Sequence, residues 1–272
     1  MKAFLTNMIE GLLLAPDRHT YWNFRHFGLT GDEFVCLGAN GKTISGLMLP
    51  GQPDQSGAVL GTVLYCHPCD HNYQYYLPQI SWLIPAGYNV VLFDYRGAGK
   101  SQGEMTLGGN VEDVLSVMRY LRTRRDIDPE RIVMFGQATG AEVALNAVNR
   151  DKRGVVALIV ESLYSSHQNW LSNRFGLGVG YLCSAFLSKV LPEPQEVIRQ
   201  VSLPLAIVVP DRDKTVSKKQ AKELIDQAPK QREVWRAEGV GYLGVFVYPC
   251  VWRSRFLEFV RDALTRKVAF ER

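Results

Sequence analysis

The stretch Ile132–Gly140 constrains the fold of this chain more than any other. It reads as a short apolar strand, then a turn bounded by Gly136 and Gly140, then a helix over Ala141–Val148. Glycines at both ends of so short a turn indicate a cramped connection that holds a residue in a strained backbone conformation. The stretch therefore predicts a sharp strand-to-helix turn that lifts the side chain of Ala138 clear of a sheet.

Apolar runs typical of buried strands alternate with helical patterns along the rest of the chain. An opening hairpin is indicated by two β runs, 33–37 and 43–49, because Gly38-Ala39-Asn40-Gly41 separates them. Strands that alternate with helices predict an α/β fold, with a mostly parallel sheet of about eight strands flanked by helices. The further expected strands are 58–66, 89–94, 155–160, 203–209 and 233–237, and the expected helices are 76–86, 111–124, 217–227 and 252–264.

The pattern changes between the expected sixth and seventh strands. Residues 173–191 are apolar but broken by glycines, and Pro192-Glu193-Pro194 then interrupts them. We interpret 162–202 as a small helical cap inserted over the carboxyl edge of the sheet, within a single domain of residues 1–272. An ordinary pair of crossover helices is the alternative.

Composition narrows the function classes. The chain has 272 residues, of which 46% are hydrophobic and 21% charged, enough for one large α/β domain. Its net charge of +4 is small and its basic runs lie on helix-like segments, so we do not expect nucleic-acid binding. Five cysteines, an odd number, do not suggest a disulfide framework. No apolar run is long enough to span a bilayer, and residues 1–15 resemble a surface-docking helix more than a signal peptide, so we expect a cytoplasmic protein.

Two short motifs invite other functions. The loop from Asp94 to Ser101 ends in Gly-Lys-Ser, but a phosphate-binding P-loop needs a glycine where Asp94 stands. Cys66-His67-Pro68-Cys69 is a C-x-x-C pair, which in a thioredoxin-like unit would begin a helix. Here the pair ends a strand and leads into a polar loop. Neither a nucleotide nor a redox cofactor is predicted, and we expect no cofactor or metal.

Together, four motifs resemble those of the α/β-hydrolase superfamily, in its serine-aminopeptidase or monoacylglycerol-lipase-like branch. They are His67-Pro68 after the third strand, the Asp94–Gly103 loop after the fourth, the turn at Ala138, and Pro210-Asp211-Arg212-Asp213 after the seventh. The resemblance covers nearly the whole chain. It implies an α/β-hydrolase fold, in which the turn at Ala138 is a nucleophile elbow and a Ser, an Asp and a His form a catalytic triad in that chain order.

Two of the three triad positions depart from this pattern. The nucleophile position holds Ala138, a methyl group. The base position, in Gly239-Val240-Gly241-Tyr242, holds a tyrosine, whose ordinary pKa near 10 makes it a poor proton acceptor at neutral pH. The acid position is kept by Asp213, which its spacing from Pro210 favours over Asp211. Two departures favour natural loss of the triad over a single engineered change.

The resemblance also implies an oxyanion hole. Its donors would be the backbone N–H groups of Thr139 and Cys69. As ligand-contacting side chains we expect His67, His71 and His167. Rewired chemistry, with Cys69 as nucleophile and His71 or His167 as base, stays open, and Glu161 ends a strand where some family members place their acid.

We therefore predict a non-catalytic protein that binds a small molecule or a protein partner in the former active-site pocket. The alternative is a serine-hydrolase-type esterase, lipase or peptidase acting on a small ester or amide, seen as an inactive variant or with rewired residues. The sequence does not fix the oligomeric state.

Overall fold

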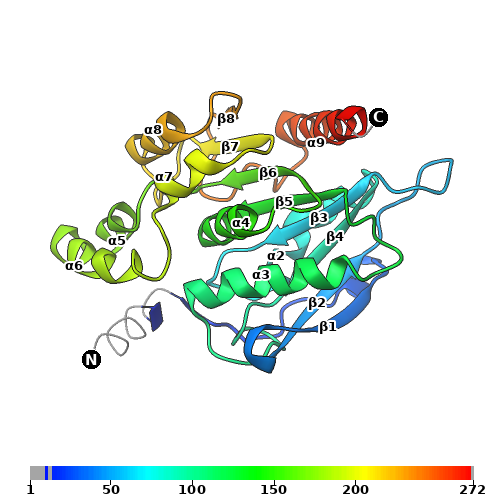
Figure 1. Cartoon of the computed structure of the whole chain (residues 1–272), viewed down its shortest axis with the longest axis horizontal. Helices are drawn as coiled ribbons and strands as arrows, with labels where there is room; N and C mark the ends of the chain where they lie inside the picture. The colour runs from blue at the N-terminus through cyan, green and yellow to red at the C-terminus, as the bar shows by residue number, and fades with distance from the viewer. Residues whose placement is uncertain (1–9, 12–13, 271–272) are drawn as a thin grey trace.

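The computed structural model describes residues 10, 11 and 14–270, and its central feature is one eight-stranded sheet (Figure 1). The strand order is β1-β2-β4-β3-β5-β6-β7-β8. β2 runs antiparallel to β1 and to β4, whereas the pairs from β4 to β8 are parallel. The mostly parallel sheet predicted from the sequence is confirmed. The expected helix over 1–15 lies almost entirely outside the described residues.

The strands follow the apolar runs of the sequence closely. Six of the eight are buried at every position or all but one, as expected for strands covered on both faces. Their bounds are β1 (Asp32–Leu37), β2 (Thr43–Leu49), β3 (Gly61–Cys66), β4 (Tyr88–Phe93), β5 (Ile132–Gln137), β6 (Val155–Glu161), β7 (Leu205–Pro210) and β8 (Glu233–Ala237).

Helices cover both faces of the sheet (Figure 1). One face carries α3 (Leu107–Leu121), α4 (Thr139–Arg150) and α8 (Lys218–Gln227), and the other carries α2 (Tyr73–Ile80) and α9 (Val251–Phe270). Side chains of the strands alternate between the two layers: Met134 of β5 packs with the first group and Phe135 with the second.

Two helix boundaries differ from the prediction because polar side chains cap the helices earlier. The helix expected over 76–86 begins at Tyr73, since Asn72 accepts a hydrogen bond from the N–H of Gln74. It ends at Ile80 and continues as a short 3₁₀ turn, and Gly87 then reverses the chain with φ 92°. The helix expected from Val111 begins at Leu107, because Thr106 caps it.

Three helices are inserted between β6 and β7: α5 (His167–Phe175), α6 (Leu177–Leu187) and α7 (Pro194–Val197). α5 and α6 lie beyond the carboxyl ends of these strands (Figure 1). This is where a cap would be inserted, and the boundaries 162–202 remain a prediction. None of the helices in the described residues combines the length and hydrophobicity needed to cross a bilayer.

The Gly-Lys-Ser loop after β4 folds around its own aspartate. The carboxylate of Asp94 accepts the N–H groups of Lys100, at 3.0 Å, and of Tyr73, at 3.2 Å. A side chain at Gly99 would begin 1.9 Å from this carboxylate. The loop is therefore arranged around an internal anion instead of an open phosphate nest.

Candidate active site

The residue at the nucleophile position is held in a strained backbone conformation. Ala138 follows β5 directly, precedes α4, and has φ 50° and ψ −120°. Such a conformation costs a non-glycine residue about 1–3 kcal/mol. Its N–H donates to the carbonyl oxygen of Glu161 at 2.9 Å, which fixes the turn to the end of β6. The elbow geometry is present with a methyl group at its tip.

The two glycines of the elbow are required by close packing. A Cβ atom at Gly136 would lie 2.6 Å from the Cα atom of Ala141 in α4. A Cβ atom at Gly140 would lie 2.2 Å from the carbonyl oxygen of Cys66 and 2.3 Å from that of His67. Glycine at both positions lets α4 approach the ends of β3 and β5, as the sequence predicted.

One predicted oxyanion donor is engaged by a neighbouring side chain. The N–H of Cys69 donates to the hydroxyl oxygen of Thr139 at 2.8 Å. Thr139 is the first residue of α4, and only 8% of its surface is exposed. The hydroxyl thus occupies the direction in which this N–H would meet a substrate oxyanion. Sequence reasoning considered the backbone of Thr139 and missed this effect of its side chain.

The thiol of Cys69 is a poor nucleophile in this setting. It is buried, and burial raises its pKa to about 12, while the amide of Asn110 donates a hydrogen bond to the sulfur at 3.2 Å. A nucleophilic cysteine needs the opposite, a lowered pKa. Cys66 is also buried and both cysteines are free. The C-x-x-C pair is a packing feature in this structure.

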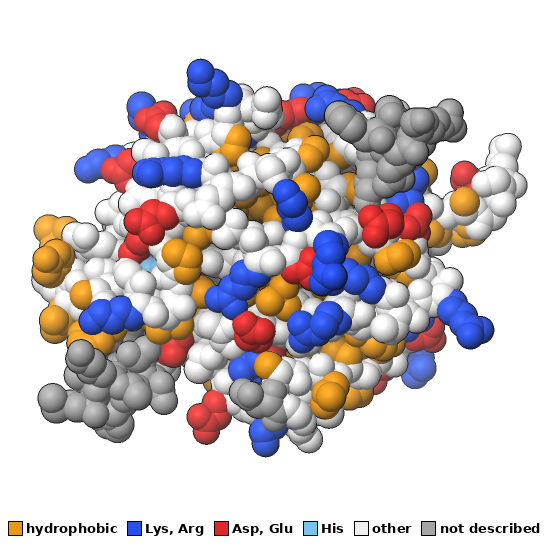
Figure 2. All heavy atoms as spheres, in the orientation of Figure 1, with side chains coloured by type: hydrophobic (Ala, Val, Ile, Leu, Met, Phe, Trp, Pro, Cys, Tyr) orange, Lys and Arg blue, Asp and Glu red, His pale blue; other side chains and the backbone are white. Residues whose placement is uncertain are grey.

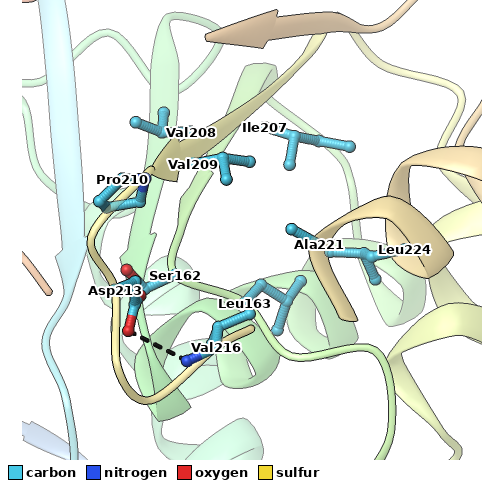
Figure 3. Close-up of a pocket in the computed structure, with 10 residues that line it drawn as sticks. All are labelled: Ser162, Leu163, Ile207, Val208, Val209, Pro210, Asp213, Val216, Ala221 and Leu224. Carbon is cyan, nitrogen blue, oxygen red and sulfur yellow. Dashed lines mark hydrogen bonds between the residues drawn. The ribbon is translucent and has the colours of Figure 1, made fainter. Parts of the chain in front are cut away.

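Asp213 lies in the loop after β7, where the sequence placed the triad acid. One carboxylate oxygen, Oδ1, accepts the N–H groups of Thr215 at 2.7 Å and Val216 at 3.0 Å. The other, Oδ2, is buried without a hydrogen-bond partner among the described residues. Figure 3 shows Asp213 beside Ser162, whose buried hydroxyl likewise finds no partner in the part of the chain that the structure describes. Both line a cavity of about 10 Å³, room for one water molecule.

Tyr242 lies near this carboxylate without bonding to it. No hydrogen bond joins Tyr242 to Asp213 in the described part of the chain, and 38% of the tyrosine surface is exposed. Partial burial, followed by the charges of Asp70, Asp213 and Glu161, raises the pKa of Tyr242 above its ordinary value. The phenol therefore stays protonated at neutral pH and cannot act as a general base.

A buried polar chain lies beneath the elbow. The hydroxyl of Tyr65 donates to Oε1 of Gln137, and Nε2 of Gln137 donates to Oε2 of Glu161 at 2.5 Å. Oε1 of Glu161 accepts the N–H of Val245, at 3.3 Å, from the loop that also carries Tyr242. Burial raises the pKa of Glu161 to about 7. In the sequence, these hydrogen bonds were signalled only by a polar residue at the end of each of two apolar strands.

The three histidines predicted to contact a ligand lie in different settings. His67 is fully buried, and its ring nitrogens lie 2.7 Å from the carbonyl oxygen of Pro68 and 3.0 Å from that of Phe93. Burial lowers its pKa to about 4, and neither nitrogen is left for a ligand. His71 is partly exposed, stacks on Tyr75 with 4.0 Å between ring centroids, and lies 3.4 Å from Asp70. Of the three, it alone presents its ring near the surface.

His167 is buried between two glutamates. Its Nε2 lies 2.6 Å from Oε1 of Glu142 in α4, and its Nδ1 lies 3.3 Å from Oε1 of Glu193 in the segment after α6. Burial alone would lower the pKa of His167, but the two carboxylates outweigh it and raise the pKa to about 10. The hydroxyl of Tyr164 also donates to Glu142. This cluster joins the inserted helices to the helix of the elbow, and it is a structural ion pair.

Three positions considered from the sequence as nucleophile or base lack the properties that such a role needs. Ala138 has no reactive atom, Cys69 is protonated, and the imidazole of His167 is charged and enclosed. Within the described residues, no set of three or more His, Cys, Asp or Glu side chains is placed to hold a metal ion. Ala138, Asp213 and Tyr242 follow strands β5, β7 and β8, which end at the same edge of the parallel sheet. That they form the remnant of one triad remains a prediction.

Known proteins resemble this chain over most of its length. Residues 57–193 match the family model described as serine aminopeptidase, S33. The uncharacterized protein YfhR of Escherichia coli is 27% identical over 229 residues, covering 83% of this chain and 78% of its own. The lysophosphatidylserine lipase ABHD12 of Danio rerio is 29% identical over 199 residues, covering 66% of this chain and 50% of its own.

Solved structures agree on the fold. The esterase Pf2001 of Pyrococcus furiosus superposes with a TM-score of 0.75 at 20% identity, covering 92% of this chain and 97% of that one. At this identity the likeness concerns the fold alone. The eight-stranded sheet and its flanking helices are an α/β-hydrolase fold.

Proposed function

The chain belongs to the serine aminopeptidase S33 family of α/β hydrolases, and on this premise we propose that it is a non-catalytic member that binds a ligand. The ligand is a small molecule or a segment of a protein partner at the former active site. The observation that carries the proposal is the state of the three triad positions: a methyl group at 138, a protonated phenol at 242, and an Asp213 carboxylate with no base to orient.

The oxyanion hole supports the same proposal. In acyl transfer, preorganised N–H groups stabilise the developing oxyanion by donating hydrogen bonds to it. Removing one such donor lowers the rate by about a hundredfold to a thousandfold. Here the Cys69 N–H is bonded to the Thr139 hydroxyl. A substrate carbonyl would have to displace that hydroxyl before the donor could stabilise a transition state.

Loss of the nucleophile alone has a large effect. In a serine hydrolase it lowers turnover by on the order of a millionfold, and the remaining rate comes from the oxyanion hole and binding. With position 138 as alanine and the hole partly filled, we expect no measurable ester hydrolysis from this site.

A second candidate is hydrolysis of an ester, with lipid esters first among them. The specific observation in its favour is that the elbow keeps its strained geometry, φ 50° at Ala138, although no nucleophile is there to benefit. The names of two similar proteins, a lysophosphatidylserine lipase and an esterase, also favour ester chemistry. This function needs a nucleophile from outside the three triad positions.

Turnover of short p-nitrophenyl esters separates the two candidates. The parent is expected to match the buffer blank, and the variant Ala138→Ser with Tyr242→His tests whether the scaffold still supports the reaction. A third substitution, Thr139→Ala, releases the Cys69 N–H and should raise the rate of the double variant. Hydrolysis by the parent above the rate of a heat-denatured sample would overturn the proposal.

A further inference from the structure

The outward face of α6 consists of apolar side chains. Leu177, Tyr181 and Leu182 are 81%, 68% and 65% exposed, and we name them the α6 patch. Figure 2 shows hydrophobic side chains gathered at this end of the molecule, over α6. A spacing of four makes Leu177 and Tyr181 neighbours on the helix surface, and Leu182 lies beside them within the same half of the helix.

This face reverses the usual pattern of a surface helix. Such a helix buries its apolar stripe and turns charged residues to water. In α6 the first inward positions, Gly180 and Ser184, are small and buried, and Leu187 at its end is buried too, while Leu177, Tyr181 and Leu182 face outward in addition. Contiguous exposed apolar side chains of this kind mark interaction sites.

The acid that follows α6 is already compensated: Glu193 is 17% exposed and paired with His167. No aspartate or glutamate occurs in residues 162–192, whereas Arg174 precedes α6 and Lys189 follows it. Lys189 is exposed and lies over the ring of Phe186, 5.6 Å from its centroid, with its charge free to reach outward. Lys214 and Lys218 are also exposed, next to the segment that Asn173 contacts through the carbonyl oxygen of Thr215.

A lipid surface fits these features better than a protein partner does. A specific protein interface uses about 20–30 residues on each side, and the α6 patch has three side chains on one helix. Interfacial helices combine aromatic and leucine side chains on one face with lysine and arginine near the headgroups. Apolar side chains flanked by cations, with the following Glu193 already paired with His167, match an anionic bilayer in both hydrophobicity and charge.

We propose that the protein docks on anionic lipid bilayers through the α6 patch. Leu177, Tyr181 and Leu182 enter the headgroup region, and Lys189, Lys214 and Lys218 lie near lipid phosphates and carboxylates. This docking is peripheral. It is independent of whether the former active site binds or hydrolyses anything.

Co-sedimentation of the full chain with vesicles tests the docking. We expect binding to vesicles of phosphatidylcholine and phosphatidylserine in equal parts, and much weaker binding to phosphatidylcholine alone. The triple substitution Leu177→Gln, Tyr181→Gln and Leu182→Gln should weaken the partition by about tenfold or more. Lys189→Gln should weaken it by about fivefold.

Matched controls distinguish docking from general stickiness. Val35→Gln with Leu37→Gln removes two apolar side chains of β1 that are 62% and 72% exposed, and Lys230→Gln removes an exposed lysine before β8. Both should leave vesicle binding unchanged. Unchanged circular dichroism and melting temperature show that each variant folds, and Leu177→Gln alone provides a milder second test.

Three results would overturn the proposal. The first is no binding to the anionic vesicles, and the second is equal binding to neutral and anionic vesicles. The third is a triple variant that binds as the parent does. Absence of vesicle binding together with a lower mass for the triple variant in sedimentation would assign the patch to a contact between copies of the chain instead.

Discussion

Replacing His167 by glutamine removes the cation that Glu142 and Glu193 share in the interior. The side chains of His167 and Glu142 are 0% exposed, and their nitrogen and oxygen lie 2.6 Å apart. Removing one partner of a buried ion pair costs about 3–5 kcal/mol, because the remaining charge is left uncompensated. Glutamine can still donate one hydrogen bond, and Tyr164 continues to donate to Glu142, so we expect a loss near the lower end, about 3 kcal/mol.

This loss is a substantial fraction of the stability of a folded domain, about 5–15 kcal/mol. Equilibrium unfolding in urea at pH 7 measures it directly. For a slope of about 1–3 kcal/mol per molar, the midpoint should fall by on the order of 1–3 M. The slope itself should stay unchanged, since the same surface is exposed on unfolding.

Two control variants separate the loss of a buried charge from the effect of any substitution at an ion pair. The double substitution Glu142→Gln with His167→Gln removes both charges, and it should be more stable than His167→Gln alone because no unpaired carboxylate faces Glu193 across the gap. Lys222→Gln breaks an exposed pair with Asp226, which should be worth about 0–1 kcal/mol. A His167→Gln loss no larger than that of Lys222→Gln would refute the reasoning, as would a double variant less stable than the single one.

Three further predictions follow from the same structure. Because the pKa of His167 is raised from 6.5 to about 10, its contribution to the stability of the fold is complete below pH 6.5 and is lost as the pH rises to about 10. The free energy of unfolding should therefore change less with pH in this window for His167→Gln than for the parent. Identical pH profiles would contradict the prediction. The pKa of Glu161 is raised to about 7, so between pH 4.5 and 7 the folded state holds a proton that the unfolded chain releases. The free energy of unfolding of the parent minus that of Glu161→Gln should therefore fall from pH 4.5 to 7. A difference that rises over this range would contradict the prediction. Ala138→Gly should be less destabilising than Ala147→Gly by about 1–3 kcal/mol, because glycine relieves the strain at φ 50°, and equal losses in thermal melts would mean that the elbow stores none.

Local signals account for the parts of the fold that the sequence predicted. The strands appear as apolar runs, and the elbow appears as two glycines that the packing of α4 against β3 and β5 requires. Asp213 was placed by its distance from the end of an apolar strand, and it lies in the loop after β7. Where local capping chemistry was overlooked, as at Asn72 and Thr106, the predicted helices began too late.

The interior of the site depends on partners that are distant in the sequence. Cys69 and Thr139 are 70 residues apart, and no sequence pattern indicates that the hydroxyl of one accepts the N–H of the other. His167 was expected to contact a ligand because it follows a strand, yet Glu142 neutralises it from another helix. Buried polar pairs of this kind can be identified only from the tertiary structure, because the sequence around each partner looks like the ordinary end of a helix or strand.

If the triad is lost, the elbow of this hydrolase fold presents no nucleophile. Intact-protein mass spectrometry after incubation with a fluorophosphonate probe answers this, with any serine esterase that the probe labels as the positive control. We expect an unshifted mass for the parent, and a single adduct on residue 138 in the Ala138→Ser, Tyr242→His variant if the scaffold is still competent. A stoichiometric adduct on the parent, at any residue of the site, would contradict it.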